Sequence, residues 1–283
     1  MKLYLSSFGA LFSVLLSVAA PAFSAGVLAG PGDKQALQAV PVFTKSEVDA
    51  AKQDPKYYTI DPASVRLELI ETKEEPDMSY VRMQEAPRDL NGILVSIDQI
   101  VNIASKVWNI IQANAPVVNI DTKYATAYPQ GITAAAQLSQ WSRPKSYVYG
   151  FYAKNLYGSV MIDSEYKVSF TYNGSYKGKG KYLTAVAVIP TSTTVGWGYK
   201  FYMSAAVPDS TIANVGTSAD PVAAMQMKLS WKMATVLKEQ DGTSIYYVEG
   251  NGYYQELANP WKKDPQVENV KAAAPLLTPG KVF

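Results

Sequence analysis

The sequence predicts a mainly β protein: an antiparallel β-sandwich of about eight strands, braced by one long amphipathic α-helix and preceded by a small N-terminal α/β-hairpin extension. The first observation is alternation in residues 224–238, where Met225, Leu229 and their odd-numbered neighbours form a nearly continuous apolar face. The second is a series of similar stretches after residue 117, separated by turn signals. The third is helical spacing of apolar residues across 90–113.

The N-terminus has the pattern of a secretory signal peptide over residues 1–24. One lysine precedes an apolar stretch, and Ala22 and Ser24 are the small residues expected before a cleavage site. We therefore expect export to the periplasm or the extracellular space, as a soluble rather than a membrane-embedded protein. Residues 25–43 follow as a flexible leader.

Residues 44–88 are expected to form a short helix and a β-hairpin. Thr44 and Glu47 have the spacing of a capping box, and the helix has to end before Pro55. A two-stranded hairpin is marginal alone, so it should lean on the rest of the protein. The hairpin strands are expected at 64–72 and 78–84.

The main domain, residues 89–256, is expected to contain the helix and the sandwich, followed by a proline-rich extension at 257–283. Asp89 is placed to cap the helix at 90–113. Strands are expected at 117–128, 145–153, 157–163, 166–173, 182–189, 195–207, 224–238 and 243–249. Turns are expected at Asn173-Gly174, Pro190, Pro208-Asp209, Asp241-Gly242 and Asn251-Gly252.

Composition excludes several kinds of catalytic site. The chain of 283 residues has no histidine and no cysteine, so it holds no Ser-His-Asp triad, cysteine nucleophile, disulfide or zinc site of the usual types. Acidic pairs such as Asp163 with Glu165 sit where carboxylates are usually just solvated. We expect a protein that is not an enzyme, with no catalytic residues, no metal and no cofactor.

Tyrosine is the unusual abundance, with 20 residues beside 5 Trp and 8 Phe. Aromatic side chains in strands mostly fill cores, and a few on the outward side would stack on ligands. The segment 176–182 combines lysines, glycines and two tyrosines, which suits an anionic ligand but also suits a hairpin edge protected against aggregation. The candidate ligand-binding residues are Lys177, Lys179, Lys181, Tyr176, Tyr182, Tyr202, Tyr253 and Tyr254.

The leading functional hypothesis is an exported, non-enzymatic binding or structural module of the cell envelope or extracellular space. Its partner would be an envelope glycan, a membrane surface or an envelope protein, contacted through an aromatic and basic surface. A net charge of +2 is too small for the electrostatic footprint of a nucleic-acid binder. The sequence leaves open whether the protein forms an oligomer.

Two alternatives use the membrane directly. In the first, the helix at 90–113 detaches as a membrane-active segment, and the order of elements over residues 90–250 then resembles the actinoporin pore-formers, in which a helix precedes an aromatic-rich sandwich without cysteine. In the second, the strands form an outer-membrane β-barrel with a transport or anchoring role, because several of them offer uncharged faces of sufficient length.

Overall fold

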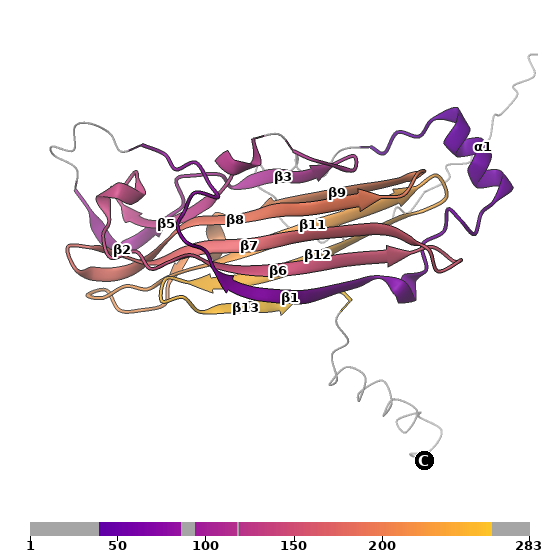
Figure 1. Ribbon diagram of the computed structural model, residues 1–283. Helices are drawn as coiled ribbons and strands as arrows, with labels where there is room; N and C mark the ends of the chain where they lie inside the picture. Colours follow the sequence, from indigo (N-terminus) through magenta and orange to yellow (C-terminus); the bar gives the residue numbers. More distant parts are fainter. Residues whose placement is uncertain (1–39, 86–93, 118, 262–283) are drawn as a thin grey trace, which may run out of the picture.

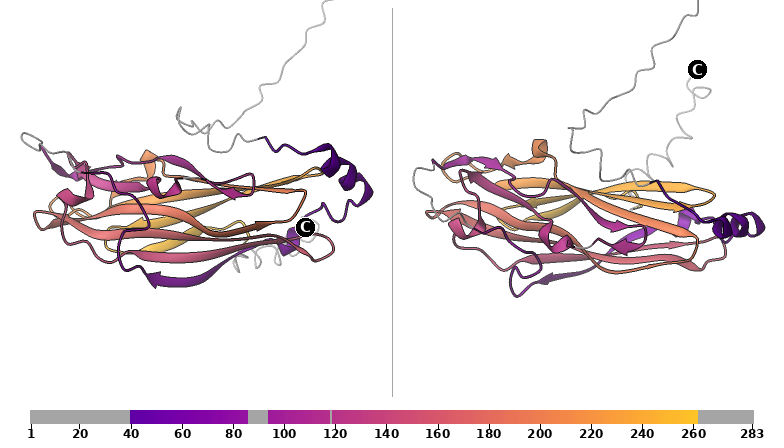
Figure 2. Two further views of the ribbon diagram at one scale, coloured as in Figure 1. Left: turned by 45° about the horizontal axis from the view of Figure 1, so that its top comes forward. Right: turned by 90° about the horizontal axis from the view of Figure 1, so that it is seen from above.

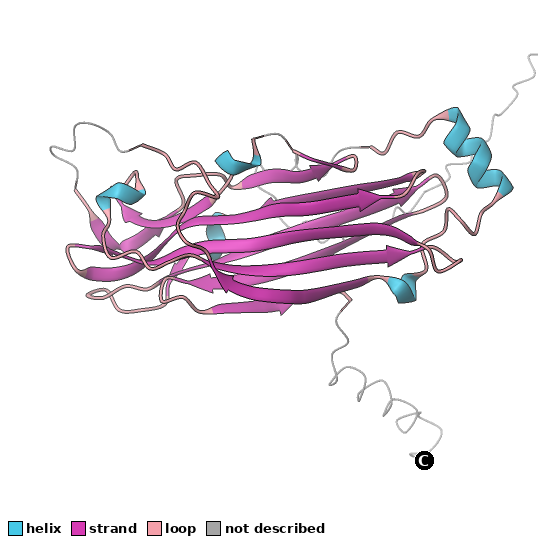
Figure 3. Ribbon diagram, viewed as in Figure 1, coloured by secondary structure: helices cyan, strands magenta, loops and turns pink. Residues whose placement is uncertain are grey.

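Two antiparallel sheets make up most of the protein. The computed structural model describes residues 40–85, 94–117 and 119–261, and a single α-helix is found within these ranges. Figure 3 shows how far strands predominate, and Figure 2 shows the elongated shape of the molecule. The prediction of a mainly β protein is confirmed. The expected signal peptide, most of the leader and residues 262–283 lie outside the described residues.

The first sheet has six strands in the order β1-β6-β7-β8-β5-β2 (Figure 1). The second has seven, in the order β13-β12-β11-β9-β3-β4, with β10 paired to β11. The strands of the six-stranded sheet are β1 (Arg66–Glu74), β2 (Ser96–Val101), β5 (Ala125–Gln130), β6 (Lys145–Lys154), β7 (Val160–Tyr176) and β8 (Lys179–Val195). Those of the seven-stranded sheet are β3 (Val107–Gln112), β4 (Ala115–Pro116), β9 (Tyr199–Ala206), β10 (Ala213–Asn214), β11 (Ala223–Thr235), β12 (Glu239–Glu249) and β13 (Tyr254–Ala258).

The core lies between the two sheets, in a sandwich-like arrangement. On β11, Met227 and Leu229 are buried while Lys228, between them in the alternation, is exposed. Phe151 of the six-stranded sheet stacks at 5.0 Å on Phe201 of the seven-stranded sheet. The apolar face predicted for residues 225–233 therefore packs against protein, which is how alternation produces a buried face.

Tyrosines join the two sheets inside this core. The hydroxyl oxygens of Tyr166 in β7 and Tyr246 in β12 lie 2.7 Å apart, and both side chains are fully buried. The hydroxyls of Tyr149 in β6 and Tyr254 in β13 form a second pair at 2.7 Å. Burying a hydroxyl group without a hydrogen-bond partner costs free energy. In each pair, the tyrosine of one sheet provides the hydrogen-bond partner for the tyrosine of the other.

The short helix α1 (Lys45–Gln53) confirms the predicted capping box. Glu47 accepts hydrogen bonds from the backbone and side chain of Thr44, and the helix ends at Asp54, before Pro55. Glu47 is buried and pairs with Lys200 of β9 at 3.3 Å, which ties the helix to the seven-stranded sheet. Short 3₁₀ helices are η1 (Pro62–Ser64), η2 (Ile120–Thr122), η3 (Ala135–Gln137) and η4 (Asp209–Thr211).

The long helix predicted at 90–113 is wrong. Its described part forms β2 and β3, which belong to different sheets, while residues 90–93 lie outside the described residues. The segment is rich in isoleucine and valine, and β-branched side chains favour strands. Apolar residues at three- and four-residue intervals also arise when two short strands follow each other across a turn, so the period alone misled the prediction.

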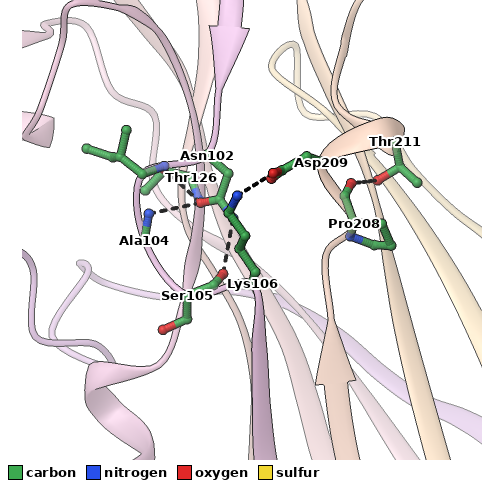
Figure 4. A network of polar contacts seen from close by, with 9 residues as sticks. Asn102, Ala104, Ser105, Lys106, Thr126, Pro208, Asp209 and Thr211 are labelled. Atoms are coloured by element: carbon green, nitrogen blue, oxygen red, sulfur yellow. Dashed lines mark hydrogen bonds and ion pairs between the residues drawn. The ribbon is translucent and has the colours of Figure 1, made fainter. Parts of the chain in front are cut away.

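Asn102 makes that turn possible (Figure 4). Its side-chain oxygen accepts from the backbone N–H of Ala104 and of Thr126, at 3.1 and 3.0 Å, and its amide donates to the carbonyl of Ser105 at 3.1 Å. The next residue, Lys106, forms an ion pair with Asp209 of η4. These bonds divert the chain from the six-stranded sheet to the seven-stranded sheet in place of a continuous helix.

The predicted N-terminal hairpin is also wrong in its pairing. β1 pairs with β6, and the expected partner at 78–84 forms turns and irregular backbone. This segment crosses the outer face of the six-stranded sheet instead. Tyr80 donates a hydrogen bond to the carbonyl of Ala185 in β8, and Val81 is buried against the same strand. The central strands of that sheet therefore carry apolar side chains on both faces.

Most of the other predicted strands are present, but several predicted turns are not. The strands expected at 157–163 and 166–173 are one strand, β7, and β5 begins only at Ala125. Long strands with bulges accommodate glycine and proline without ending. The turn at Asn251-Gly252 is confirmed. Three predicted turns are wrong, because their residues lie inside strands: Asn173-Gly174 in β7, Pro190 in β8 and Asp241-Gly242 in β12.

Replacing Asn102 by alanine should destabilise the protein by about 3 kcal/mol, because the backbone N–H groups of Ala104 and of the buried Thr126 lose their acceptor. Urea unfolding of N102A and of the wild type measures the difference. Asn109→Ala, which truncates a half-buried asparagine on β3, is the matched control. Equal stability of N102A and N109A would contradict the role of this turn.

Stability should fall in acid through the carboxylate of Glu75. Burial opposes ionisation, but hydrogen bonds from Lys167 and Ser146, each 2.7 Å long, outweigh it and lower the pKa of Glu75. A carboxylate whose pKa is lowered by folding gives its full stabilisation when the pH is above its pKa in the unfolded chain, about 4.3. The stabilisation is lost as the pH falls through the lower pKa of the folded protein. Between about pH 5 and pH 3, the unfolding free energy should therefore drop less for Glu75→Gln than for the wild type. Glu74→Gln, at the exposed neighbouring residue, is the control. If the unfolding free energy of the wild type and of both variants fell in parallel with pH, the role assigned to Glu75 would be refuted.

Candidate functional site

The strongest candidate site is the tip of the hairpin formed by β7 and β8. Tyr176 pairs with Lys179 across a two-residue turn, Lys177-Gly178, whose φ angles of 51° and 76° are both positive. Two-residue turns of this kind match the twist of the strands that they join. The three lysines of the tip, Lys177, Lys179 and Lys181, are all exposed, and we call them the basic tip.

The basic tip rests on a rigid base. The backbone N–H of Gly180 donates to the carboxylate of Asp220 at 2.9 Å, and that of Lys181 donates to the carbonyl of Pro221 at 2.8 Å. The ring of Tyr182 lies over Gly180, where an added Cβ would be 2.6 Å from the ring. These contacts hold the start of β8 in place, so its lysines project from a fixed backbone.

A second turn, between β12 and β13, lies beside the basic tip. The carbonyl of Gly250 accepts from the N–H of Asn173 at 2.7 Å. An added Cβ at Gly250 would be 2.0 Å from the carbonyl oxygen of Lys181, so only glycine allows the two backbones to approach this closely. Tyr253 leaves this turn with 48% of its surface exposed. The structure therefore brings Tyr253 to the same end of the molecule as the basic tip.

The lysines of the basic tip are not paired with acidic side chains among the described residues, so their ammonium groups are available to a ligand. None of the three forms an ion pair with a described residue, and the ammonium of Lys177 lies 5.2 Å from the ring centroid of Tyr176. The nearby carboxylate of Glu249 accepts from the hydroxyl of Tyr247 at 2.9 Å, and burial raises the pKa of Tyr247 to about 12. The site is thus a set of exposed lysines that form no ion pair with the described residues, near carboxylates that accept hydrogen bonds from neutral donors.

The structure buries two of the tyrosines predicted for the site and half-buries a third that was expected to face outward. Tyr182 is fully buried and donates to the carbonyl of Ile97 at 2.7 Å, and burial raises its pKa. Tyr202 is 7% exposed beside its cross-strand partner Lys232, so its expected outward position is wrong. Tyr254 is half-buried against the core, where its ring stacks on Tyr147 at 3.6 Å and its hydroxyl pairs with that of Tyr149, so its expected outward position is also wrong. Tyr176 is half-buried and Tyr253 is exposed.

Sequence reasoning missed Asp220 and Gly250, which hold the basic tip in place. Asp220 is 40 residues from the glycine that it contacts, and Gly250 belongs to a different hairpin. Lys145, which was also missed, donates to the carbonyl of Gly252 at 3.1 Å. No local pattern marks these residues, because each acts through a segment distant in sequence.

The described residues contain no cluster of three or more acidic, histidine or cysteine side chains suited to a metal ion. No helix among them has the length and apolar character needed to cross a membrane. The chain matches no protein-family model, no curated protein and no solved structure.

Substituting Gly180 should test how the basic tip is supported. Gly178 and Gly180 both have positive φ angles, 76° and 77°, but an added Cβ meets nothing within 4 Å at Gly178 and meets the Tyr182 ring at Gly180. Gly178→Ala should cost about 1 kcal/mol of unfolding free energy from backbone strain. Gly180→Ala should cost about 3 kcal/mol, because the ring has to move as well. Urea unfolding measures both, and equal losses would show that the ring contact contributes nothing.

Proposed function

We propose that the protein is an exported, non-enzymatic binding module of the cell envelope or extracellular space that holds a polyanionic glycan at the basic tip. The observation that carries this proposal is the exposure of Lys177, Lys179 and Lys181 on one braced hairpin, at the same end of the molecule as the exposed ring of Tyr253. Ammonium groups bind sulfate, phosphate and carboxylate groups, and an aromatic ring packs against a sugar.

The rigidity of the hairpin supports binding. A ligand that contacts a preorganised surface loses less free energy to ordering than one that contacts a mobile loop. The backbone of the tip is already held by Asp220, Pro221 and the Gly250 turn. The remaining cost is the ordering of the three lysine side chains.

Other parts of the proposal rest on the sequence. The absence of histidine and cysteine favours binding over catalysis. Export rests on residues 1–24, which lie outside the described residues. The pore-forming alternative is withdrawn, because the helix on which it depended is replaced by β2 and β3.

Binding to dextran sulfate, with uncharged dextran as the reference, tests the proposal. The full chain should bind dextran sulfate, and the affinity should fall with added salt as the charges are screened. The triple variant Lys177→Gln, Lys179→Gln, Lys181→Gln should bind about tenfold more weakly, because three exposed charge pairs at about 0.5 kcal/mol each together contribute about 1.5 kcal/mol. Isothermal titration or surface plasmon resonance measures the change.

The matched control removes the same charge elsewhere. Lys73, Lys123 and Lys228 are exposed and dispersed over the surface, and their triple Gln variant should keep the wild-type affinity. Equal losses in the two triple variants would mean that net charge, and not the basic tip, drives binding. Equal affinity of the wild type for dextran and dextran sulfate would also refute the proposal.

A further inference from the structure

The end of the molecule opposite the basic tip carries large apolar side chains on its turns. Three turns meet there: β6–β7 at 155–159, β8–β9 at 196–198 and β11–β12 at 236–238, at the end where α1 lies in Figure 1. Their exposed apolar side chains are 46–58% accessible. We call this set the apolar end; it consists of Leu156, Tyr157, Val160, Trp197 and Leu237.

The turns that carry these side chains are neighbours in the two sheets. The N–H of Gly196 donates to the carbonyl of Met161 at 2.7 Å, which places Trp197 beside Val160 on the neighbouring strand. The pairing of Thr235 with Tyr199 brings the third turn alongside the second. The apolar end is therefore one surface and not three unrelated loops.

The residue types are unusual for turns. Tight turns are normally made by glycine, asparagine, aspartate, serine and proline, and the turns at the opposite end follow this rule with Lys177-Gly178 and Asn251-Gly252. The turns at the apolar end also contain asparagine and glycine, at Asn155, Gly158 and Gly198, but tryptophan, tyrosine and leucine occupy exposed positions among them. Contiguous exposed apolar residues of this kind mark interaction surfaces.

The turns are held from beneath by buried aromatic rings. Gly198 has a φ angle of 79°, and an added Cβ there would be 2.3 Å from the ring of Tyr58. Tyr58 is buried, stacks on Tyr199 at 6.5 Å and meets the ring of Trp197 at 6.0 Å. Trp197 is thus presented outward from a fixed base.

Lysines surround the apolar end. Lys56 and Lys238 are exposed and Lys154 is half-buried, and none of them forms an ion pair with a described residue. Three acids at this end already have partners: Asp54 accepts from the hydroxyl of Tyr157 at 2.9 Å, Asp61 accepts from the N–H of Ala63 at 3.0 Å, and Glu239 pairs with Lys232 at 3.3 Å. The apolar end therefore combines exposed apolar side chains with lysines that form no ion pair with a described residue.

From this combination we infer that the apolar end docks on the surface of an anionic phospholipid bilayer. Tryptophan and tyrosine prefer the interface between headgroups and acyl chains, and lysines near an anionic surface each strengthen binding about fivefold. Five side chains on separate tips fall well short of the roughly 20–30 residues per side of a stable protein interface. A fluid bilayer does not require an interface of that size, because its lipids rearrange around individual inserted side chains.

Docking at this end would leave the basic tip pointing away from the membrane, since the two lie at opposite ends of an elongated molecule (Figure 2). The protein would then hold its glycan at a distance from the bilayer. This inference does not depend on the glycan proposal, because the two surfaces share no residue.

Quenching of Trp197 fluorescence by brominated acyl chains tests the inference. The full chain is mixed with vesicles of brominated phosphatidylcholine, alone or with phosphatidylglycerol, and the signal of Trp197 is the difference between the wild type and Trp197→Phe. We expect quenching with the phosphatidylglycerol vesicles and weaker quenching at high salt. Because the signal is read at Trp197, attachment through the apolar N-terminal segment does not produce it.

Two variants separate the apolar and basic contributions. Leu156→Ser with Leu237→Ser should abolish the quenching, and Lys56→Gln with Lys154→Gln and Lys238→Gln should weaken the apparent affinity on the order of 100-fold. The triple Gln variant of Lys73, Lys123 and Lys228 should behave as the wild type. Absence of quenching with both kinds of vesicle, or full quenching in the double serine variant, would overturn the inference.

Discussion

The pairing of tyrosine hydroxyls between the two sheets is the constraint on which the rest of the structure depends. A tyrosine ring can be buried only if its hydroxyl finds a partner, and here Tyr166 and Tyr149 find theirs on the opposite sheet, at Tyr246 and Tyr254. Hydrogen bonds have direction and length, so these pairs also fix how the sheets are aligned. Once the alignment is fixed, the turns at the two ends of the sandwich are fixed in position as well.

A second use of tyrosine explains more of its abundance. Aromatic rings lie directly over glycines at several points where the backbone would otherwise be uncovered, including Tyr152 over Gly150, Tyr182 over Gly180 and Tyr58 over Gly198. A ring on a glycine fills the space that a Cβ would occupy and shields the backbone from water. The last two of these pairs support the basic tip and the apolar end, so the same device braces both proposed contact surfaces.

The two ends of the molecule differ because of what their turns carry, and not because of the sheets. The same long strands, β7 and β8, run from Val160 and Val195 at the apolar end to Tyr176 and Lys179 at the basic tip. Both ends are therefore mounted on one rigid element. A module with a membrane-directed end and a glycan-directed end needs this kind of connection, because a flexible link would not keep the two surfaces apart.

The sequence by itself determined the features that depend on neighbouring residues. The alternation of residues 224–238, the capping box at Thr44 and the lysine-glycine pattern of the basic tip were all readable because each pattern lies within one short segment. The tertiary structure alone decided whether residues 94–113 became part of a helix or two strands, since Asn102 holds the turn between the strands through Thr126. It also decided that Tyr202 and Tyr254 are covered and Tyr253 is not, because burial depends on side chains from strands that are distant in sequence and adjacent only after folding.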